Sequence, residues 1–392
     1  MNALFGFIVG VPLLAFAAAL AATLLGMRRV SEVRHLAIDE RPAWPRVSIV
    51  VPACDEELAV EAALRSLLGQ RYPSVQVVAV DDRSSDGTGA IMDRLAGEDD
   101  RLSVVHIDAL PEGWLGKLNA LHRGVSQSDG EWLLFADADA HLGPDTLKKC
   151  ISHADAGGID FVSVIPHTES AGFLGDTVFN VAGATLCLVM RPWRIRDRRT
   201  TTLGASGAFM LVRRAAFERT PGFEWLKLEV ADDFGLCLMI KTHGGRCDLL
   251  NGRDEVKIAW YTSLGEIVTR MQKNFFAVTG GFSPLKIFGH ATLLAWFGLF
   301  PLALLLPGEA PWAPWARMML AAAVVMQVVM TLVAGRWTAR PVAPSLVPSL
   351  GFLFLSFMMV RAAIIGWRMG GIRWRGVFYP TSLLKGCQRV KV

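Results

Sequence analysis

The 392-residue chain has few charged residues: they make up 19% of the sequence, whereas hydrophobic residues make up 52%. Soluble domains usually carry about 25% charged residues, so a wholly soluble protein is not expected. The high apolar content also excludes a mainly disordered chain. The formal net charge of +4 is too small to indicate a nucleic-acid-binding protein, and we expect no nucleic-acid partner.

Paired cysteines and glycine-rich nucleotide motifs are also lacking. The six cysteines are scattered and contain no CxxC pair, which excludes a zinc ribbon and argues against a disulfide framework. Reduced thiols in a cytosolic compartment are the simplest interpretation. No GxGxxG follows the first predicted strand, which argues against a dinucleotide oxidoreductase.

Charged side chains are absent from residues 1–27, a run longer than the 18–20 apolar residues that span a bilayer. Arg28 and Arg29 follow this run, whereas a signal peptide would begin with basic residues, so we predict an uncleaved anchor over 3–26. Three more uncharged runs lie near the end of the chain, at 287–308, 318–335 and 341–360. The predicted organisation is an anchor at 1–27, a water-soluble domain at 45–285, membrane helices at 286–366 and a basic tail at 367–392.

Arginines that follow the anchor place the soluble domain on the cytoplasmic side of the inner (plasma) membrane, in a multi-pass protein. The loop 307–316 has no Lys or Arg, as an outside loop should. If the run 341–360 also spans the membrane, however, the basic tail at 367–392 lies on the outer side. A re-entrant or interfacial segment would resolve this conflict, so two to three C-terminal transmembrane helices remain possible.

The soluble domain alternates short apolar runs with helical patterns. The predicted strands are 47–52, 75–80, 102–107 and 131–136, and the helices between them are 56–69, 87–96 and about 115–126. This alternation predicts an α/β domain with a mostly parallel sheet. Ligands of such sheets bind beyond the carboxyl ends of the strands. Polar clusters follow three of these strands, so we expect a site there.

Two of the clusters are pairs of acids at strand ends. Asp81-Asp82 opens the sequence DDRSSDGT, which also fits an ordinary capped turn, but capping does not explain two adjacent acids. Asp137 and Asp139 follow the strand 131–136, and two carboxylates at this spacing suit a hard divalent cation. The alternative is an ordinary acidic strand end.

The other two clusters lie near predicted helix starts. Lys117 follows Gly116 and could contact a phosphate, although a solvated surface lysine is the simpler interpretation of this residue alone. Asp232-Asp233 either interacts with a helix dipole or contains a general base. We expect the helix N-terminus to keep Asp233 ionised near neutral pH, and Asp232 to support the preceding loop.

Taken together and in order, these clusters resemble the membrane-bound family 2 glycosyltransferases, over roughly residues 45–285. The matching segments are Val51-Pro52-Ala53 with Glu56, Asp81-Asp82-x-Ser84-x-Asp86, Gly116-Lys117, Asp137-x-Asp139, Gly204-Ala205-Ser206-Gly207-Ala208 and Asp232-Asp233-x-x-Leu236. The stretch 265–285 and the sequence Trp374-Arg375-Gly376 look more like the hopanoid-biosynthesis-associated and ceramide-glucosyltransferase-like branches.

The resemblance implies a GT-A nucleotide-sugar-binding fold, a nucleotide-sugar donor and a lipid or membrane-associated acceptor. It implies that Pro52, Ala53, Glu56 and Asp82 line the nucleoside, with Lys117 and Asp232 also at the substrate. Asp137 would bind the ribose, and Asp139 would bind a Mg or Mn ion. Asp233 would be the base that deprotonates the acceptor in an inverting displacement.

Two departures from the family pattern limit this interpretation. Asp55 stands where the family often has asparagine, and no (Q/R)xxRW motif is present. Its nearest match is Arg270-Met-Gln-Lys273-Asn274, whose two cations we expect near the diphosphate. The missing motif counts against a processive synthase. The alternatives are a polysaccharide-synthesising glycosyltransferase and a non-catalytic membrane scaffold with a degenerate nucleotide-binding domain.

Residues 172–190 form another nearly uninterrupted apolar stretch, which an arginine-rich segment at 191–199 follows. We predict an interfacial helix on the cytoplasmic leaflet, with the arginines at anionic headgroups. A core helix with a solvated basic turn is the alternative.

Overall fold

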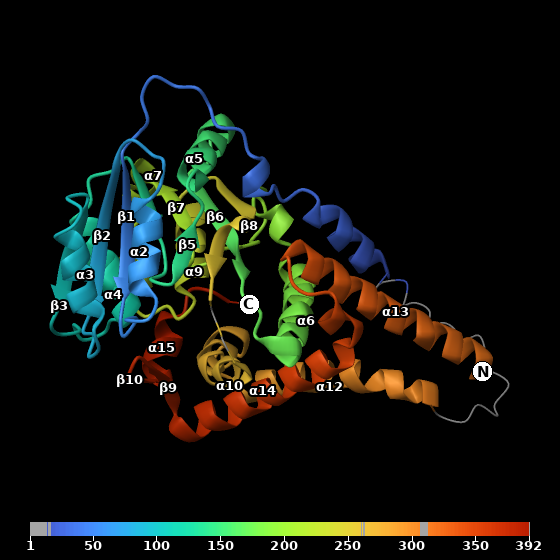
Figure 1. The fold of residues 1–392 in the computed structure, drawn as a ribbon. Helices are drawn as coiled ribbons and strands as arrows, with labels where there is room; N and C mark the ends of the chain where they lie inside the picture. The colour runs from blue at the N-terminus through green and yellow to red at the C-terminus, as the bar shows by residue number, and fades with distance from the viewer. Residues whose placement is uncertain (1–13, 15–16, 260, 262, 306–312, 392) are drawn as a thin grey trace. The chain divides into compact units, whose positions relative to one another are not determined.

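A computed structural model describes residues 14, 17–259, 261, 263–305 and 313–391 (Figure 1). The chain forms two compact units. The α/β unit comprises residues 30–169, 192–260 and 371–392, and the helical unit comprises 1–29, 170–191 and 261–370. Most of the predicted anchor at 1–27 lies outside the described residues, and its described part contains an apolar helix, Ala17–Met27.

The α/β unit is built on an eight-stranded sheet in the order β3-β2-β1-β4-β7-β6-β8-β5. Its strands are β1 (Val47–Ala53), β2 (Val75–Asp82), β3 (Leu102–Ile107), β4 (Trp132–Phe135), β5 (Ala140–Leu142), β6 (Phe161–Thr168), β7 (Met210–Arg213) and β8 (Cys247–Ile258). β1, β2, β3 and β4 are mutually parallel, as are β6 and β8. β7 runs antiparallel to both of its neighbours, and β5 is antiparallel to β8.

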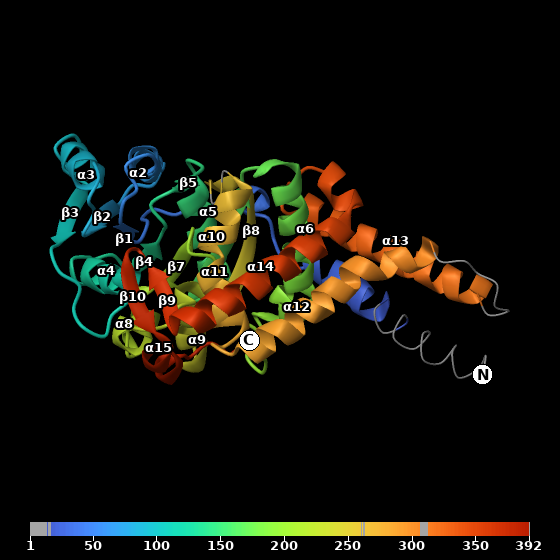
Figure 2. The same cartoon turned by 90° about the horizontal axis from the view of Figure 1, so that it is seen from below.

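Short helices connect and cover these strands (Figures 1 and 2). They are η1 (Val33–His35), α2 (Val60–Leu68), α3 (Thr88–Ala96), α4 (Gly116–Ser126), α5 (Thr146–Gly157), η2 (Pro192–Arg194), α7 (Arg214–Glu218), α8 (Phe223–Leu226) and α9 (Asp232–Thr242). At the C-terminus, β9 (Gly371–Trp374), β10 (Val377–Pro380) and α15 (Thr381–Cys387) complete the unit. The predicted basic tail is therefore largely folded.

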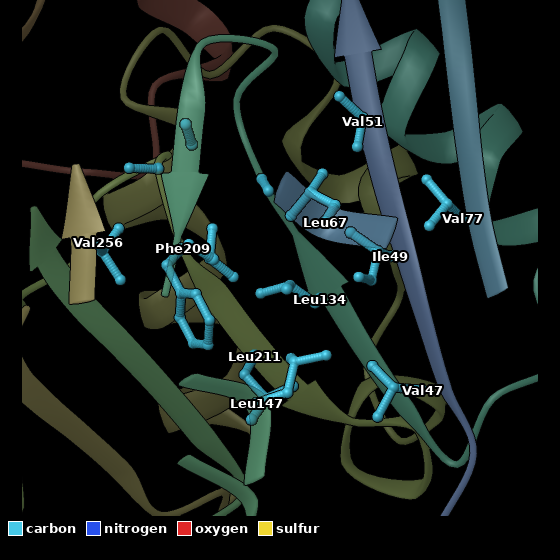
Figure 3. Close-up of a cluster of buried hydrophobic side chains, with 14 of the residues drawn as sticks. Val47, Ile49, Val51, Leu67, Val77, Leu134, Leu147, Phe209, Leu211 and Val256 are labelled. Atoms are coloured by element: carbon cyan, nitrogen blue, oxygen red, sulfur yellow. The ribbon is translucent and has the colours of Figure 1, made fainter. Parts of the chain in front are cut away.

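The core of the α/β unit lies between the sheet and its helices (Figure 3). Every residue of β1 is buried, as expected of a central parallel strand covered on both faces. Ile49 and Leu134 on neighbouring strands pack with Leu67 of α2 and Leu147 of α5. Burying one such side chain stabilises the fold by roughly 1.5–3 kcal/mol, so the sheet provides a rigid support for the loops at its edge.

The four predicted strands are confirmed to within one or two residues, but the first predicted helix begins late. The helical spacing predicts a start at residue 56, whereas α2 begins at Val60. The backbone N–H groups of Asp55, Glu56 and Glu57 instead donate to side chains of the loop after β2 and of the first residue of α3, at 3.1, 2.7 and 3.1 Å. These hydrogen bonds hold the loop after β1 against the segment that follows β2, so its residues do not join helix α2.

The helical unit contains the long apolar helices. They are α6 (Gly172–Met190), α12 (Pro284–Leu299), α13 (Ala313–Trp337) and α14 (Pro348–Met369), with α10 (Leu264–Arg270), α11 (Gln272–Asn274), η3 (Phe275–Thr279), η4 (Phe300–Leu305) and η5 (Ala343–Leu346) between them. Among the described residues, four helices are long and apolar enough to cross a membrane, and α6 is one of them. The last predicted run, 341–360, is one continuous helix only from Pro348 onward.

Helix α6 packs against other helices of the helical unit, whereas its apolar residues Phe173, Leu186 and Val189 are exposed. A Cβ on Gly351 of α14 would come within 2.7 Å of Thr177 and Val181 of α6, so the two helices approach closely. Asp176 of α6 is buried and pairs with Arg340, whose Nη1 lies 2.6 Å from its Oδ1. The Arg340 guanidinium also lies 4.2 Å from the centre of the Phe179 ring.

Breaking this buried ion pair should destabilise the helical unit. Removing one partner of such a pair leaves an uncompensated charge and typically costs about 3–5 kcal/mol. We therefore expect Asp176→Leu and Arg340→Met each to lower the melting temperature of the detergent-solubilised protein, and the double variant to recover much of the loss. Lys286→Met, which removes an exposed charge from α12, is the control. Additive losses in the double variant would contradict a coupled pair.

Candidate active site

The site lies where the loops after β1, β2 and β4 meet at one edge of the sheet. In the parallel register, Ala53 of β1 lies opposite Asp81 of β2, and Val50 lies opposite Phe135 of β4. The segments that follow these strands therefore emerge together. Pro52 and Ala53 are buried in β1 itself, and Ala53 belongs to the hydrophobic core. The structure thus brings the first two polar clusters to the same place.

Lys117 connects the other two clusters to this edge. Its Nζ lies 2.8 Å from Oδ1 of Asp137 and 2.7 Å from Oδ2 of Asp232. Burial alone would lower the pKa of Lys117, but the charges of Asp137 and Asp232 outweigh it and raise the pKa well above its usual value. The interpretation as a solvated surface lysine is therefore wrong, because two carboxylates hold the ammonium inside the site.

Glycines allow these charged groups to approach the backbone. A Cβ on Gly207 would lie 2.7 Å from Oδ2 of Asp137 and 2.9 Å from Nζ of Lys117. A side chain on Gly116 would overlap the carboxylate of Asp82. The Gly207 carbonyl also accepts a hydrogen bond from the backbone N–H of Asp137, at 3.1 Å. The glycine motif at 204–208 thus forms one wall of the site.

Asp139 is a poorly compensated acid in this cluster. Burial, together with the negative charges of Asp137 and Glu56, raises its pKa to about 7. Lys117 opposes this effect, but its ammonium contacts Asp137. A buried carboxylate that is costly to ionise fits a position where a cation would bind. Within the described part of the chain, however, no three His, Cys, Asp or Glu side chains form a group that could hold a metal ion.

Asp233 lies beside Asp232 in the first turn of α9 and is partly buried. Its Oδ1 accepts a hydrogen bond from the backbone N–H of Phe234 at 2.8 Å. Burial, together with the negative charge of Asp232, raises the pKa of Asp233 to about 7. Desolvation and the like charge of Asp232 thus oppose the expected effect of the helix N-terminus, which favours an ionised Asp233 near neutral pH.

We expected Asp232 to support the preceding loop. In the structure its carboxylate forms an ion pair with Lys117. The loop is instead held by Glu229, whose Oε1 accepts from the backbone N–H of Ala231 at 3.1 Å. The sequence interpretation missed Glu229. The signal available in the sequence was an acid between two apolar residues, Leu228 and Val230, three residues before Asp232.

Two arginines were also missed as members of the site. Arg83 donates from Nε to Oδ1 of Asp82 at 2.8 Å, and Arg375 donates from Nη2 to Oε1 of Glu56. The two predicted nucleoside-binding acids are thus both ion-paired. Arg270 and Lys273 belong to the helical unit, on α10 and α11, where Arg270 pairs with Glu266 at 3.1 Å.

The sequence of the α/β unit matches a known family over much of its length. Residues 48–220 match the family described as Glycosyl transferase family 2. This range contains Glu56, Asp82, Lys117, Asp137 and Asp139, whereas Asp232 and Asp233 lie beyond it.

The matches to individual relatives cover less than half of each relative's length. The chain is 30% identical over 220 residues to a beta-monoglucosyldiacylglycerol synthase of Trichormus variabilis, a match that covers 55% of this chain and 46% of the relative. It is 28% identical over 113 residues to GalNAc(5)-diNAcBac-PP-undecaprenol beta-1,3-glucosyltransferase of Campylobacter jejuni, which covers 29% of this chain and 36% of that protein. The chain thus spans about half or less of the length of these relatives.

One solved structure resembles the whole chain in fold. It is the mannosyltransferase PcManGT from Pyrobaculum calidifontis, in complex with GDP-Man and Mn2+, with a TM-score of 0.52 and 21% identity. The match covers 91% of this chain and 98% of the mannosyltransferase, so the α/β fold is GT-A-like, as predicted. The α/β unit, with its acids gathered at one sheet edge, thus has a GT-A-like fold, and residues 48–220 are similar in sequence to Glycosyl transferase family 2.

Proposed function

We propose that the protein is a membrane-bound inverting glycosyltransferase that moves a sugar from a nucleotide-sugar donor to a lipid or membrane-associated acceptor. The observation that carries this proposal is the cluster around Lys117, in which a lysine from the start of α4 meets acids from the loop after β4 and from the start of α9. Capped turns and solvated lysines do not require charged groups from separate segments to meet. Transfer of a sugar from a nucleotide diphosphate, in contrast, needs both a cation site and a base.

The similar proteins support the donor and the acceptor class. The mannosyltransferase PcManGT, which shares the fold, forms a complex with GDP-Man and Mn2+. The names of the two relatives refer to lipids, a diacylglycerol and an undecaprenol diphosphate. The four apolar helices fit an acceptor that resides in a membrane. Under this proposal the helices hold the chain in the inner membrane, with the α/β unit on the cytoplasmic side.

The carboxylates fit the binding of a divalent cation whose coordination shell the substrate completes. Asp139 is the proposed ligand to Mg or Mn, and Asp137, which Lys117 already neutralises, is the proposed ribose partner. Because three protein ligands do not gather within the described residues, oxygen atoms of the donor diphosphate would complete the coordination. When bound, such a cation offsets the charge that builds up on the leaving diphosphate.

Asp233 is the proposed general base. Its pKa near 7 matches proton abstraction at neutral pH better than the ordinary value of an aspartate, because a base works best with a pKa near the operating pH. Asp233 removes the proton of the acceptor hydroxyl as this oxygen attacks the anomeric carbon. Asp232 keeps Lys117 in place and, through its charge, sets the basicity of Asp233.

Replacing Asp139 by Asn should abolish the metal dependence of donor binding while leaving the fold intact. The amide keeps the size of the side chain but loses the charge that a hard cation requires. Calorimetric titration of nucleotide sugar with and without Mn2+ measures this effect. Asp145→Asn, which changes an aspartate at the start of α5, is the matched control. If Asp139→Asn retains a metal-dependent affinity equal to wild type, the metal assignment is wrong.

Replacing Asp233 by Asn should lower turnover by about 10²–10⁴-fold, the usual loss for a general base, while nucleotide-sugar binding persists. The wild-type rate should rise with pH through about 7 and then level off, because only the deprotonated carboxylate accepts a proton.

Asp232→Asn is the matched comparison for this pH profile. Without the neighbouring negative charge the pKa of Asp233 falls, so the acid limb of the profile should move to lower pH, with a smaller loss of turnover. Near-normal turnover of Asp233→Asn with a native acceptor would exclude Asp233 as the base. Metal-independent binding and no transfer in the wild type would favour the membrane scaffold alternative.

A further inference from the structure

The C-terminal segment 371–391 belongs to the α/β unit and forms an antiparallel hairpin followed by α15. β9 and β10 are joined by two residues, Arg375 and Gly376, with φ of +47° and +78°. Two-residue hairpin turns with two positive φ values prefer Asn-Gly, because other side chains are strained there. An arginine at the first position therefore points to a requirement for its side chain.

The hairpin and the residues after α15 are anchored on two loops of the site (Figure 2). The buried Tyr379 donates from its hydroxyl to the carbonyl of Trp114, three residues before Lys117, at 3.3 Å. Oε2 of Glu229 accepts from the backbone N–H groups of Arg389 and Val390, at 2.6 and 3.0 Å. These contacts fix the hairpin relative to the starts of α4 and α9.

The tip of the anchored hairpin reaches the acidic edge of the sheet. Arg375 donates from Nη2 to Glu56, and Glu56 lies close enough to Asp139 for its charge to act on that carboxyl. The Arg375 side chain is 42% exposed. A guanidinium carries five N–H donors in a planar fork, so Nε and Nη1 can bind a phosphate while Nη2 contacts Glu56.

A purely stabilising role does not explain this arrangement. An ion pair with a partner this exposed contributes about 0–1 kcal/mol, and the strained turn offsets part of that gain. A cation paired with Glu56, whose charge acts on the proposed metal ligand Asp139, in contrast suits the binding of an anion that also binds the metal. Arginine is the residue that recognises phosphate oxygens in a bidentate manner.

We infer that Arg375 binds the diphosphate of the nucleotide-sugar donor and that Glu56 positions its guanidinium for this contact. The inference rests on the proposed function and deepens it, because it adds a donor-binding residue from the C-terminal hairpin to the family 2 domain. The donor site is then completed by a segment that lies 319 residues from Glu56 in the sequence.

The test is nucleotide binding by the full-length protein in detergent. UDP, GDP, ADP and CDP, each with Mn2+, are titrated calorimetrically into wild type, Arg375→Ala, Arg375→Lys and Arg373→Ala. Arg373 is an exposed arginine of β9 in the same hairpin, so its variant removes the same charge without removing the contact to Glu56. The nucleoside of whichever diphosphate binds is titrated as well.

Arg375→Ala should weaken binding of the nucleoside diphosphate by about 10–100-fold, the range for a charged hydrogen bond, and leave nucleoside affinity unchanged. Arg375→Lys should be intermediate, and Arg373→Ala should bind like wild type. Unchanged diphosphate affinity of Arg375→Ala overturns the inference, as does an equal loss for nucleoside and diphosphate or an equal loss in Arg373→Ala. If the wild type binds none of the four diphosphates, the proposed function fails and the inference fails with it.

Discussion

The ammonium of Lys117 between Asp137 and Asp232 is the interaction on which the candidate site depends. It joins the start of α4, the loop after β4 and the start of α9. Without a cation at this point, the carboxylates of the loop after β4 and of the start of α9 would repel one another across a partly buried space. Lys117 therefore lets the fold concentrate negative charge at one sheet edge. Gly116 and Gly207 provide the room that this arrangement needs.

This ion pair also divides the acids into two kinds. Asp137 and Asp232 contact the ammonium, whereas Asp139 and Asp233 do not, and burial together with nearby carboxylates raises the pKa of both to about 7. The proposed cation ligand and the proposed base are thus two acids whose ionisation the fold disfavours. Substrate or metal binding would relieve that cost, so the unfavourable electrostatics of the site favour its proposed ligands.

The helical unit uses polar contacts for a different purpose. Asp176 with Arg340, and Asn180 with Ser345, join α6 to the chain around η5, in a unit whose other contacts are mostly apolar. Apolar helices can slide past one another with little change in energy, whereas a buried polar pair has one favourable register. We propose that these pairs fix α6 among the apolar helices.

Local patterns in the sequence were sufficient to predict the sheet and its polar clusters. The apolar runs that become β1, β2, β3 and β4 differ from their surroundings in residue type and periodicity, which nearby residues alone determine. Parallel strands end at one edge, so the meeting of Asp81-Asp82 with Asp137 followed from chain order. The late start of α2 did not follow, because it depends on side chains about thirty residues away.

The state of each acid was decided only by the tertiary structure. Whether Lys117 is solvated or buried depends on loops more than a hundred residues apart, and no spacing rule encodes that distance. The pKa of Asp233 follows from its burial and from the charge of Asp232, which oppose the local helix effect that the sequence predicts. The contact of Arg375 with Glu56 joins the two ends of the α/β unit. The sequence by itself thus determined which chemical groups are present and in which loops, whereas folding determined their charges and partners, because burial and long-range pairing exist only in the assembled fold.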